Sequence, residues 1–251
     1  DACLVVSAEE SDWLTVEALL ALLGAQAKGG KKPKGVLSIH STEFGRCGNI
    51  RQNKGDSSRI AELEHHGLDA AHMAIAVSYA LKQELAAQYG VPSWKVEPIY
   101  NGCNAHEFSG EIDPVAVKLR HGLKPGDPLV FFGGRNTIQK GPDLLIEAMP
   151  LILAKHPGCQ FAFSSGGDME NGLRSRAASL GAADKCRFLG MMPRQEFTEL
   201  MRASDIVAVP SRNEPFGIVV LEAWAAGKPV VVTHVGGPEE YVTHEVNGLK
   251  T

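Results

Sequence analysis

Residues 206–233 read IVAVPSRNEPFGIVVLEAWAAGKPVVVT, and they carry the strongest indication of the fold class. Two short apolar runs, 206–209 and 230–233, enclose a helical pattern over 218–226. Near-continuous apolar runs of this length are typical of parallel strands that are covered on both faces. A strand, a helix and a second strand in this order predict a β-α-β unit with a right-handed crossover and therefore a parallel sheet.

The same alternation extends over the rest of the chain. Further strands are predicted at 2–7, 36–40, 73–77, 96–100, 129–132, 160–164 and 186–189. Further helices are predicted at 16–27, 78–88, 115–121, 143–155, 173–180 and 194–203. The stretch 101–127 lacks a strand and is rich in glycine and proline, so we expect an inter-domain linker at 101–113. The sequence therefore predicts two α/β domains with parallel sheets, over 1–105 and 106–251.

The composition excludes several classes of protein. The chain has 251 residues, of which 44% are hydrophobic and 22% charged, with a net charge of -4. This balance is that of a globular protein, and it provides no basic field for nucleic acid or an anionic membrane. The five cysteines form no C-x-x-C, and no apolar run approaches the roughly 18 residues of a membrane helix. We therefore expect a cytoplasmic protein without a disulfide framework, a zinc site or a transmembrane segment.

The helix predicted at 218–226 begins in a way that suits a phosphate. Pro215 and Gly217 do not suit a helix interior, so the helix should begin near Phe216 or Gly217. Its first N–H groups have no partner within the helix and, together with the helix dipole, they favour an anion. Glu214 precedes this terminus, and Glu222 lies two turns on, where it can accept hydrogen bonds from ribose hydroxyls. Judged by spacing alone, Glu214 could equally well be an ordinary N-cap residue and Glu222 an ordinary surface residue, with no role in binding.

A second segment, 131–141, reads FFGGRNTIQKG and carries two cations, Arg135 and Lys140, after a strand end and two glycines. A diphosphate leaving group gains negative charge that must be stabilised. Arginine can bind it with two hydrogen bonds, and lysine as a point charge. Taken alone, a pair of solvated cations in a β-α loop explains this segment at least as well.

Together these segments resemble the retaining GT-B glycosyltransferases of family 4, which include bacterial glycogen and starch synthases. The family patterns G-R-x4-K-G and Glu-x7-Glu are met by Gly134, Arg135, Lys140, Gly141, Glu214 and Glu222. Shorter matches are the S-I-H motif at 38–40, the linker motif at 100–104, where Tyr100 replaces the usual proline, and the D-W-L-T segment at 12–15. The resemblance spans nearly the whole chain and implies two Rossmann-like domains, of which the N-terminal one is incomplete.

The resemblance also implies a role for each matching residue. Arg135 and Lys140 would bind the donor diphosphate and stabilise it as it leaves. Glu214 would contact hydroxyls of the transferred sugar, and Glu222 those of the ribose. His40 would lie over the donor sugar near the reacting centre. The other implied donor-binding residues are Gly134, Gly167, Gly217, Ile218 and Val219.

The implied activity is transfer of a sugar, with glucose favoured, from a nucleotide-diphosphate sugar to a glycan or small acceptor with retention at the anomeric carbon. Arg46 and Asn49 are candidate acceptor or donor contacts. No D-x-D stands at a strand end, so we expect metal-independent chemistry without a cofactor.

Two alternatives stay open: a sugar-nucleotide 2-epimerase, and a fragment that only binds, since the family's first and last units are expected to be missing. The absence of G-x-G-x-x-G argues against a dinucleotide oxidoreductase. The base, the sugar and the acceptor are not determined by these motifs.

Overall fold

The computed structural model describes residues 3–8, 34–50 and 55–251 of the chain. The predicted helix at 16–27 and the D-W-L-T segment at 12–15 lie outside the described residues.

Two compact units make up the chain. Unit 1 comprises Asp1–Asn101 with Asn213–Phe216, and unit 2 comprises Gly102–Arg212 with Gly217–Thr251. The predicted boundary between residues 105 and 106 stays a prediction.

Unit 1 contains a parallel sheet in which the strands follow one another in chain order, β1-β2-β3-β4. Its strands are β1 (Cys3–Ala8), β2 (Lys34–Ile39), β3 (Met73–Ala76) and β4 (Val96–Pro98). Its described helices are α2 (Glu43–Arg46), α3 (Asp56–Ala70), α4 (Tyr79–Tyr89) and the 3-10 turn η1 (Ser93–Lys95).

Local chemistry explains where α4 begins and ends. The Ser78 hydroxyl accepts a hydrogen bond from the Leu81 N–H at 2.9 Å, which satisfies one of the free donors at the helix start. Gly90 ends the helix with a φ of 66°, a left-handed conformation that glycine adopts at little cost. Helices α2 and α3 were not predicted.

Unit 2 contains a second parallel sheet and the larger share of the described helices. Its strands are β5 (Leu129–Phe132), β6 (Gln160–Ser164), β7 (Cys186–Gly190), β8 (Ile206–Val209), β9 (Val230–Val232) and β10 (Leu249–Lys250). Its helices are α5 (Pro114–Arg120), α6 (Pro142–Lys155), α7 (Glu170–Ser179), α8 (Arg194–Ala203), α9 (Ile218–Ala225) and α10 (Gly237–Tyr241), with the 3-10 turns η2 (Ala105–Phe108) and η3 (Ala183–Lys185).

The strand order of this sheet is β10-β9-β8-β5-β6-β7, and every pairing is parallel. The chain builds outward from β5 through β6 to β7, then crosses back and builds outward on the other side through β8, β9 and β10. The direction of winding therefore reverses between β5 and β8. In open α/β sheets this reversal opens a crevice at the carboxyl ends of the strands, where ligands bind.

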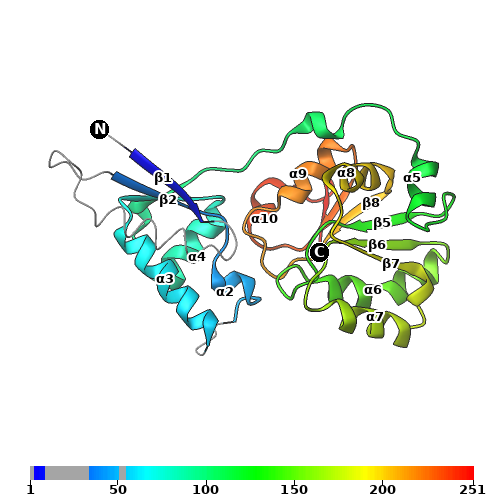
Figure 1. Cartoon of the computed structure of the whole chain (residues 1–251), viewed down its shortest axis with the longest axis horizontal. Coiled ribbons are helices and arrows are strands. Elements are labelled where there is room, and N and C mark those ends of the chain that lie inside the picture. The colour runs from blue at the N-terminus through cyan, green and yellow to red at the C-terminus, as the bar shows by residue number, and fades with distance from the viewer. Residues whose placement is uncertain (1–2, 9–33, 51–54) are drawn as a thin grey trace. The chain divides into compact units, whose positions relative to one another are not determined.

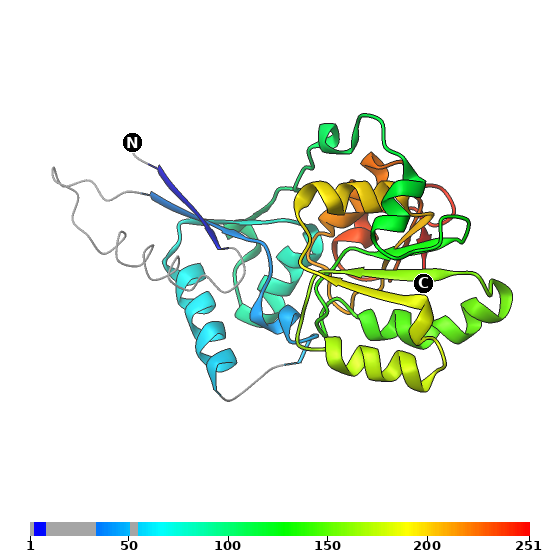
Figure 2. The same cartoon turned by 45° about the vertical axis from the view of Figure 1, so that its right-hand side comes forward.

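Alternating side chains of this sheet enter two separate cores. Phe131 and Val207 pack with Leu200 of α8 and Val220 of α9. On the opposite face, residues such as Phe132 pack with the buried side chains of α6 and α7. Figure 1 and Figure 2 both show α6 and α7 together on one face of this sheet and α8 on the other. Burial on both faces explains why these strands read as continuous apolar runs.

The predicted α/β class with parallel sheets is confirmed. The predicted strand bounds differ from the observed ones by at most two residues. The short elements β10 and α10 were not predicted.

Candidate functional site

The two predicted phosphate-binding segments of unit 2 leave the sheet at neighbouring strands. β5 pairs with β8 through Val130 opposite Ile206 and Phe131 opposite Val207. The loop after β5 contains Arg135 and Lys140, and the loop after β8 leads to α9. Because carboxyl ends of parallel strands share one edge, both loops begin side by side at the point where the winding reverses.

The start of α9 has the form that an anion site requires. Gly217 is its N-cap, with φ 85° and ψ 52°, and no side chain caps this terminus. The Gly217 carbonyl accepts hydrogen bonds from the Val220 N–H at 2.9 Å and from the Tyr241 hydroxyl at 3.0 Å. These contacts hold the turn while the N–H groups of Ile218 and Val219 stand at the positive end of the helix dipole.

Gly133 allows the loop after β5 to pack against the first turn of α9. A Cβ at this position would lie 2.8 Å from Val219 Cγ2 and 3.2 Å from Phe197 Cζ. Any side chain here would push the loop away from the helix. The structure therefore brings the segment with the predicted cations together with the predicted phosphate-binding helix.

A residue that we did not predict, Arg212, anchors the loop that ends in Lys140. Its backbone N–H donates to Gln139 O at 2.8 Å, and its guanidinium donates to both carboxylate oxygens of Asp143 at 2.8 and 2.6 Å. The hydrogen bonds from Arg212 hold the pKa of Asp143 below its usual value. Gly141 completes the contact, because a Cβ there would lie 2.1 Å from Pro210 O. The position of Lys140 thus depends on the loop after β8.

Asn136, also not predicted, joins the loops after β5 and β6. It is fully buried, its N–H donates to Gly166 O at 3.0 Å, and its side-chain amide donates to Ser165 O at 3.0 Å. A Cβ on Gly167 would lie 2.2 Å from Asn136 O, so only glycine fits this predicted site position. Ser165 has a φ of 76°, a strained conformation for a residue with a side chain, as is common at functional sites.

Glu222 lies in α9 and is 6% exposed. Its Oε1 lies 2.7 Å from Nη2 of Arg194, which is the first residue of α8. Burial raises the pKa of the Glu222 carboxyl, and the hydrogen bond and charge of Arg194 act against this rise. Spacing gave no signal for Arg194, because the contact joins two helices separated in sequence.

The remaining predicted residues belong to unit 1 or to the loop before α9. Glu214 is 5% exposed. His40 follows β2, and its Nε2 lies 3.2 Å from the Ser38 hydroxyl. Asn49 has a φ of 66°. The roles predicted for these residues stay predictions.

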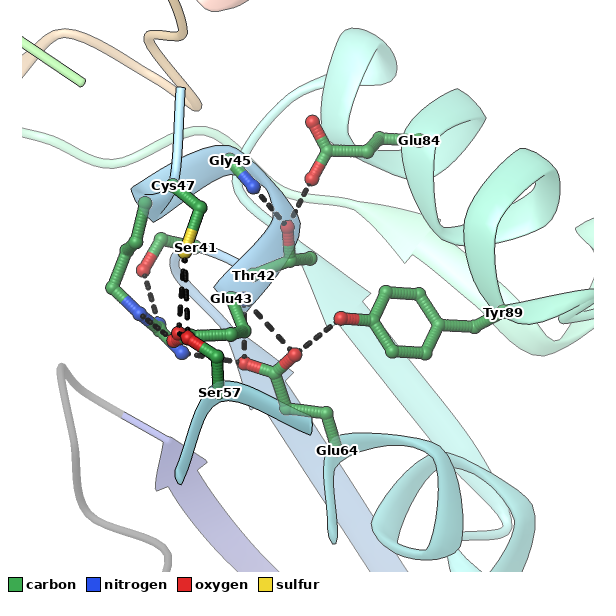
Figure 3. A network of polar contacts seen from close by, with 10 residues as sticks. Ser41, Thr42, Glu43, Gly45, Cys47, Ser57, Glu64, Glu84 and Tyr89 are labelled. Atoms are coloured by element: carbon green, nitrogen blue, oxygen red, sulfur yellow. Dashed lines mark hydrogen bonds and ion pairs between the residues drawn. The ribbon is translucent and has the colours of Figure 1, made fainter. Parts of the chain in front are cut away.

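Arg46 takes part in a polar network that the sequence did not reveal. Its guanidinium pairs with Glu43 at 3.1 Å and with Glu64 at 2.7 Å. Tyr89 of α4 donates to the other Glu64 oxygen, and Ser57 of α3 donates to Glu43, so the network joins α2, α3 and α4 (Figure 3). Burial raises the pKa of Glu64, and Arg46 counteracts this rise.

The same three helices line a cavity of about 350 Å³ in unit 1. Its lining residues include Glu43, Phe44, Ser57, His65 and Tyr89. Within residues 34–50 and 55–251, no cluster of three or more His, Cys, Asp or Glu side chains could hold a metal ion. In the part of the chain that the structure describes, no helix has both the length and the apolar character for crossing a membrane.

Comparison with known families agrees with this arrangement. The model of the family described as glycosyl transferases group 1 matches residues 117–250, just over half of the chain. The chain belongs to this family. A second model, glycosyltransferase family 4, matches residues 7–107 of this group 1 glycosyl transferase. The predicted family resemblance is confirmed.

Two relatives illustrate the relationship. An uncharacterised glycosyltransferase of Methanocaldococcus jannaschii is 39% identical over 241 residues, which are 95% of this chain and 60% of the relative. A D-inositol 3-phosphate glycosyltransferase of Nocardia farcinica is 32% identical over 207 residues, which are 80% of this chain and 44% of the relative. The group 1 glycosyl transferase described here thus spans about half of the length of the relatives that it matches.

Solved structures show the same fold. HepE of Anabaena, in complex with UDP-glucose, has a TM-score of 0.79 at 24% identity and covers 98% of this chain and 64% of its own. Sucrose-phosphate synthase of Thermosynechococcus elongatus has a TM-score of 0.76 at 23% identity, covering 99% of this chain and 60% of its own. The GT-B fold predicted for this group 1 glycosyl transferase is confirmed.

Proposed function

We propose that this protein is a retaining glycosyltransferase that moves a sugar, most simply glucose, from a nucleotide-diphosphate donor to a glycan or small acceptor. The observation that supports this most strongly is the packing of the loop after β5 against the first turn of α9. A Cβ added at Gly133 would lie 2.8 Å from Val219 Cγ2, so the loop with Arg135 and Lys140 adjoins an uncapped helix start. Two cations and a row of free N–H groups suit a diphosphate.

The chemistry follows from where charge develops. As the bond between the anomeric carbon and the donor phosphate oxygen breaks, negative charge grows on the diphosphate. Arg135, Lys140 and the N–H groups of Ile218 and Val219 stabilise this charge. The leaving phosphate oxygen accepts the proton of the acceptor hydroxyl while the sugar passes through an oxocarbenium-like state. Since the new bond forms on the face that the diphosphate leaves, the anomeric configuration is retained.

The proposal keeps the roles that the family resemblance implies for other residues. Glu222 accepts hydrogen bonds from the donor ribose, and Glu214 and His40 keep their implied roles toward the transferred sugar. No metal takes part in the proposed route. UDP-glucose enters as a candidate donor because HepE was solved with it, and D-inositol 3-phosphate as a candidate acceptor because relatives are named for it.

Donor choice can be measured by thermal unfolding with ADP-glucose, GDP-glucose and UDP-glucose. The preferred donor raises the melting temperature by mass action. The preferred donor is then incubated with D-inositol 3-phosphate or oligosaccharide acceptors, and products are analysed by mass spectrometry and NMR. We expect a new glycosidic bond with the anomeric configuration of the donor. An epimerised donor would indicate a 2-epimerase, an inverted product would refute retention, and binding without product would indicate a binding protein.

Lys140→Ala tests the assignment of the diphosphate site. Loss of one charge-assisted contact costs on the order of 1.5–3 kcal/mol in transition-state stabilisation, or roughly a 10- to 150-fold fall in kcat/KM. Lys155→Ala is the matched control, because Lys155 is an exposed lysine at the opposite end of α6. Equal activity of the two variants would contradict the role of Lys140.

A further inference from the structure

Arg194 stands at the centre of an ion-pair chain that links three elements of unit 2. Its Nη2 lies 2.7 Å from Glu222 Oε1, and its Nε lies 2.6 Å from Glu107 Oε2. Glu107 belongs to η2, which packs against both α8 and α9. The arginine therefore bridges a carboxylate on α9 and a carboxylate on η2.

Two aromatic rings fix the guanidinium between these carboxylates. The Arg194 guanidinium carbon lies 5.4 Å from the ring centre of Phe108 and 5.4 Å from that of Phe197. Both distances are within the range of cation–π attraction. With carboxylates and rings around it, the side chain has little freedom to rotate.

The burial of Glu222 makes such a partner necessary. The Glu222 side chain is 8% exposed, whereas those of Arg194 and Glu107 are 49% and 37% exposed. An ionised carboxylate removed from water is unfavourable unless a positive charge lies beside it. Arg194 supplies that charge at Oε1 of this carboxylate.

We propose that Arg194 is a positioning residue that holds the Glu222 carboxylate ionised and oriented so that its second oxygen accepts a hydrogen bond from the donor ribose. This inference rests on the proposed function. Arg194 acts through Glu222, with which it is paired at 2.7 Å. The proposal predicts that discrimination between ribose and deoxyribose depends on Arg194 as well as on Glu222.

The experiment measures nucleotide affinity by calorimetry on the full protein with ADP, GDP and UDP and with the 2′-deoxy and 3′-deoxy form of each. For the best-bound nucleotide, wild type should lose about 10- to 100-fold in affinity when the recognised hydroxyl is removed, the size of a hydrogen bond to a charged group. Arg194→Met should reduce this ratio to about threefold or less, and Glu222→Gln should reduce it similarly.

Arg174→Met is the matched control, because Arg174 also pairs with a glutamate, at 2.7 Å, and also lies over a phenyl ring, at 4.6 Å. It should keep the wild-type ratio. The ratio is insensitive to the folded fraction of a variant, so a purely structural role of Arg194 would leave it unchanged.

An unchanged ratio in Arg194→Met, or a wild type that binds ribose and deoxyribose forms equally, would overturn the inference while leaving the proposed function standing. A wild type that binds none of the nucleotides would overturn the proposed function itself.

Discussion

Replacing Gly141 by alanine tests whether the loop after β5 is held against the loop after β8 as the structure describes. Gly141 has a φ of 62°, and a Cβ there would lie 2.1 Å from Pro210 O. The left-handed backbone costs an alanine about 1–2 kcal/mol. Overpacking against a backbone atom adds about 1–3 kcal/mol. A gain of about 0.4–1 kcal/mol from a less flexible unfolded chain offsets part of this, so we expect a loss of about 1–5 kcal/mol.

Two control substitutions separate these contributions. Gly181 has a φ of 69° and open space around its Cβ position, so Gly181→Ala should lose about 1 kcal/mol from backbone strain alone. Gly126 has open space and no positive φ, so Gly126→Ala should be neutral or slightly stabilising. The difference between Gly141→Ala and Gly181→Ala then measures the clash with Pro210.

Urea unfolding followed by tryptophan fluorescence measures these effects. The chain has three tryptophans, so a background with Trp13→Phe and Trp94→Phe leaves Trp224 as the reporter in unit 2. The shift in the urea midpoint multiplied by the slope gives each change in the free energy of unfolding. If Gly141→Ala and Gly181→Ala shift the midpoint equally, the close approach of these loops is refuted, and with it the structural basis for the position of Lys140.

Two further predictions concern partly buried carboxylates. Because Arg212 lowers the pKa of Asp143, the Asp143 carboxylate binds a proton less readily in the folded state than in the unfolded chain. The resulting stabilisation of the folded state is fully present above the ordinary pKa of about 3.9. It is lost as the pH falls through the pKa of Asp143 in the folded state. Asp143→Asn should therefore cost about 1 kcal/mol at pH 7, with a difference from wild type that shrinks toward pH 3 in urea titrations; a difference independent of pH would contradict the ion pair. Tyr89→Phe removes the hydroxyl that donates to buried Glu64 and should cost about 1–3 kcal/mol in thermal unfolding, whereas an unchanged melting temperature would show that Glu64 does not need this donor.

Elements with a strong local signal could be predicted from the sequence. β5 and β6 are buried along their whole length, so β5 reads as a continuous apolar run and β6 as an apolar centre between two polar ends. The start of α9 follows from Gly217, because glycine readily adopts the left-handed conformation found there. Helix α3 was not predicted. Only Gly67 and Leu68 are buried along its fifteen residues, so its sequence shows no apolar stripe.

The sequence by itself determined the chemistry of the two phosphate-binding segments, since glycines, cations and a helix start are local features. Only the tertiary structure decided that these segments meet, because the pairing of β5 with β8 reverses the winding of the sheet and periodicity does not encode strand order. The partner of Glu222 was likewise decided in three dimensions. A carboxylate buried by packing requires a nearby positive charge, and the packing of both α8 and α9 against η2 brings Arg194 beside it.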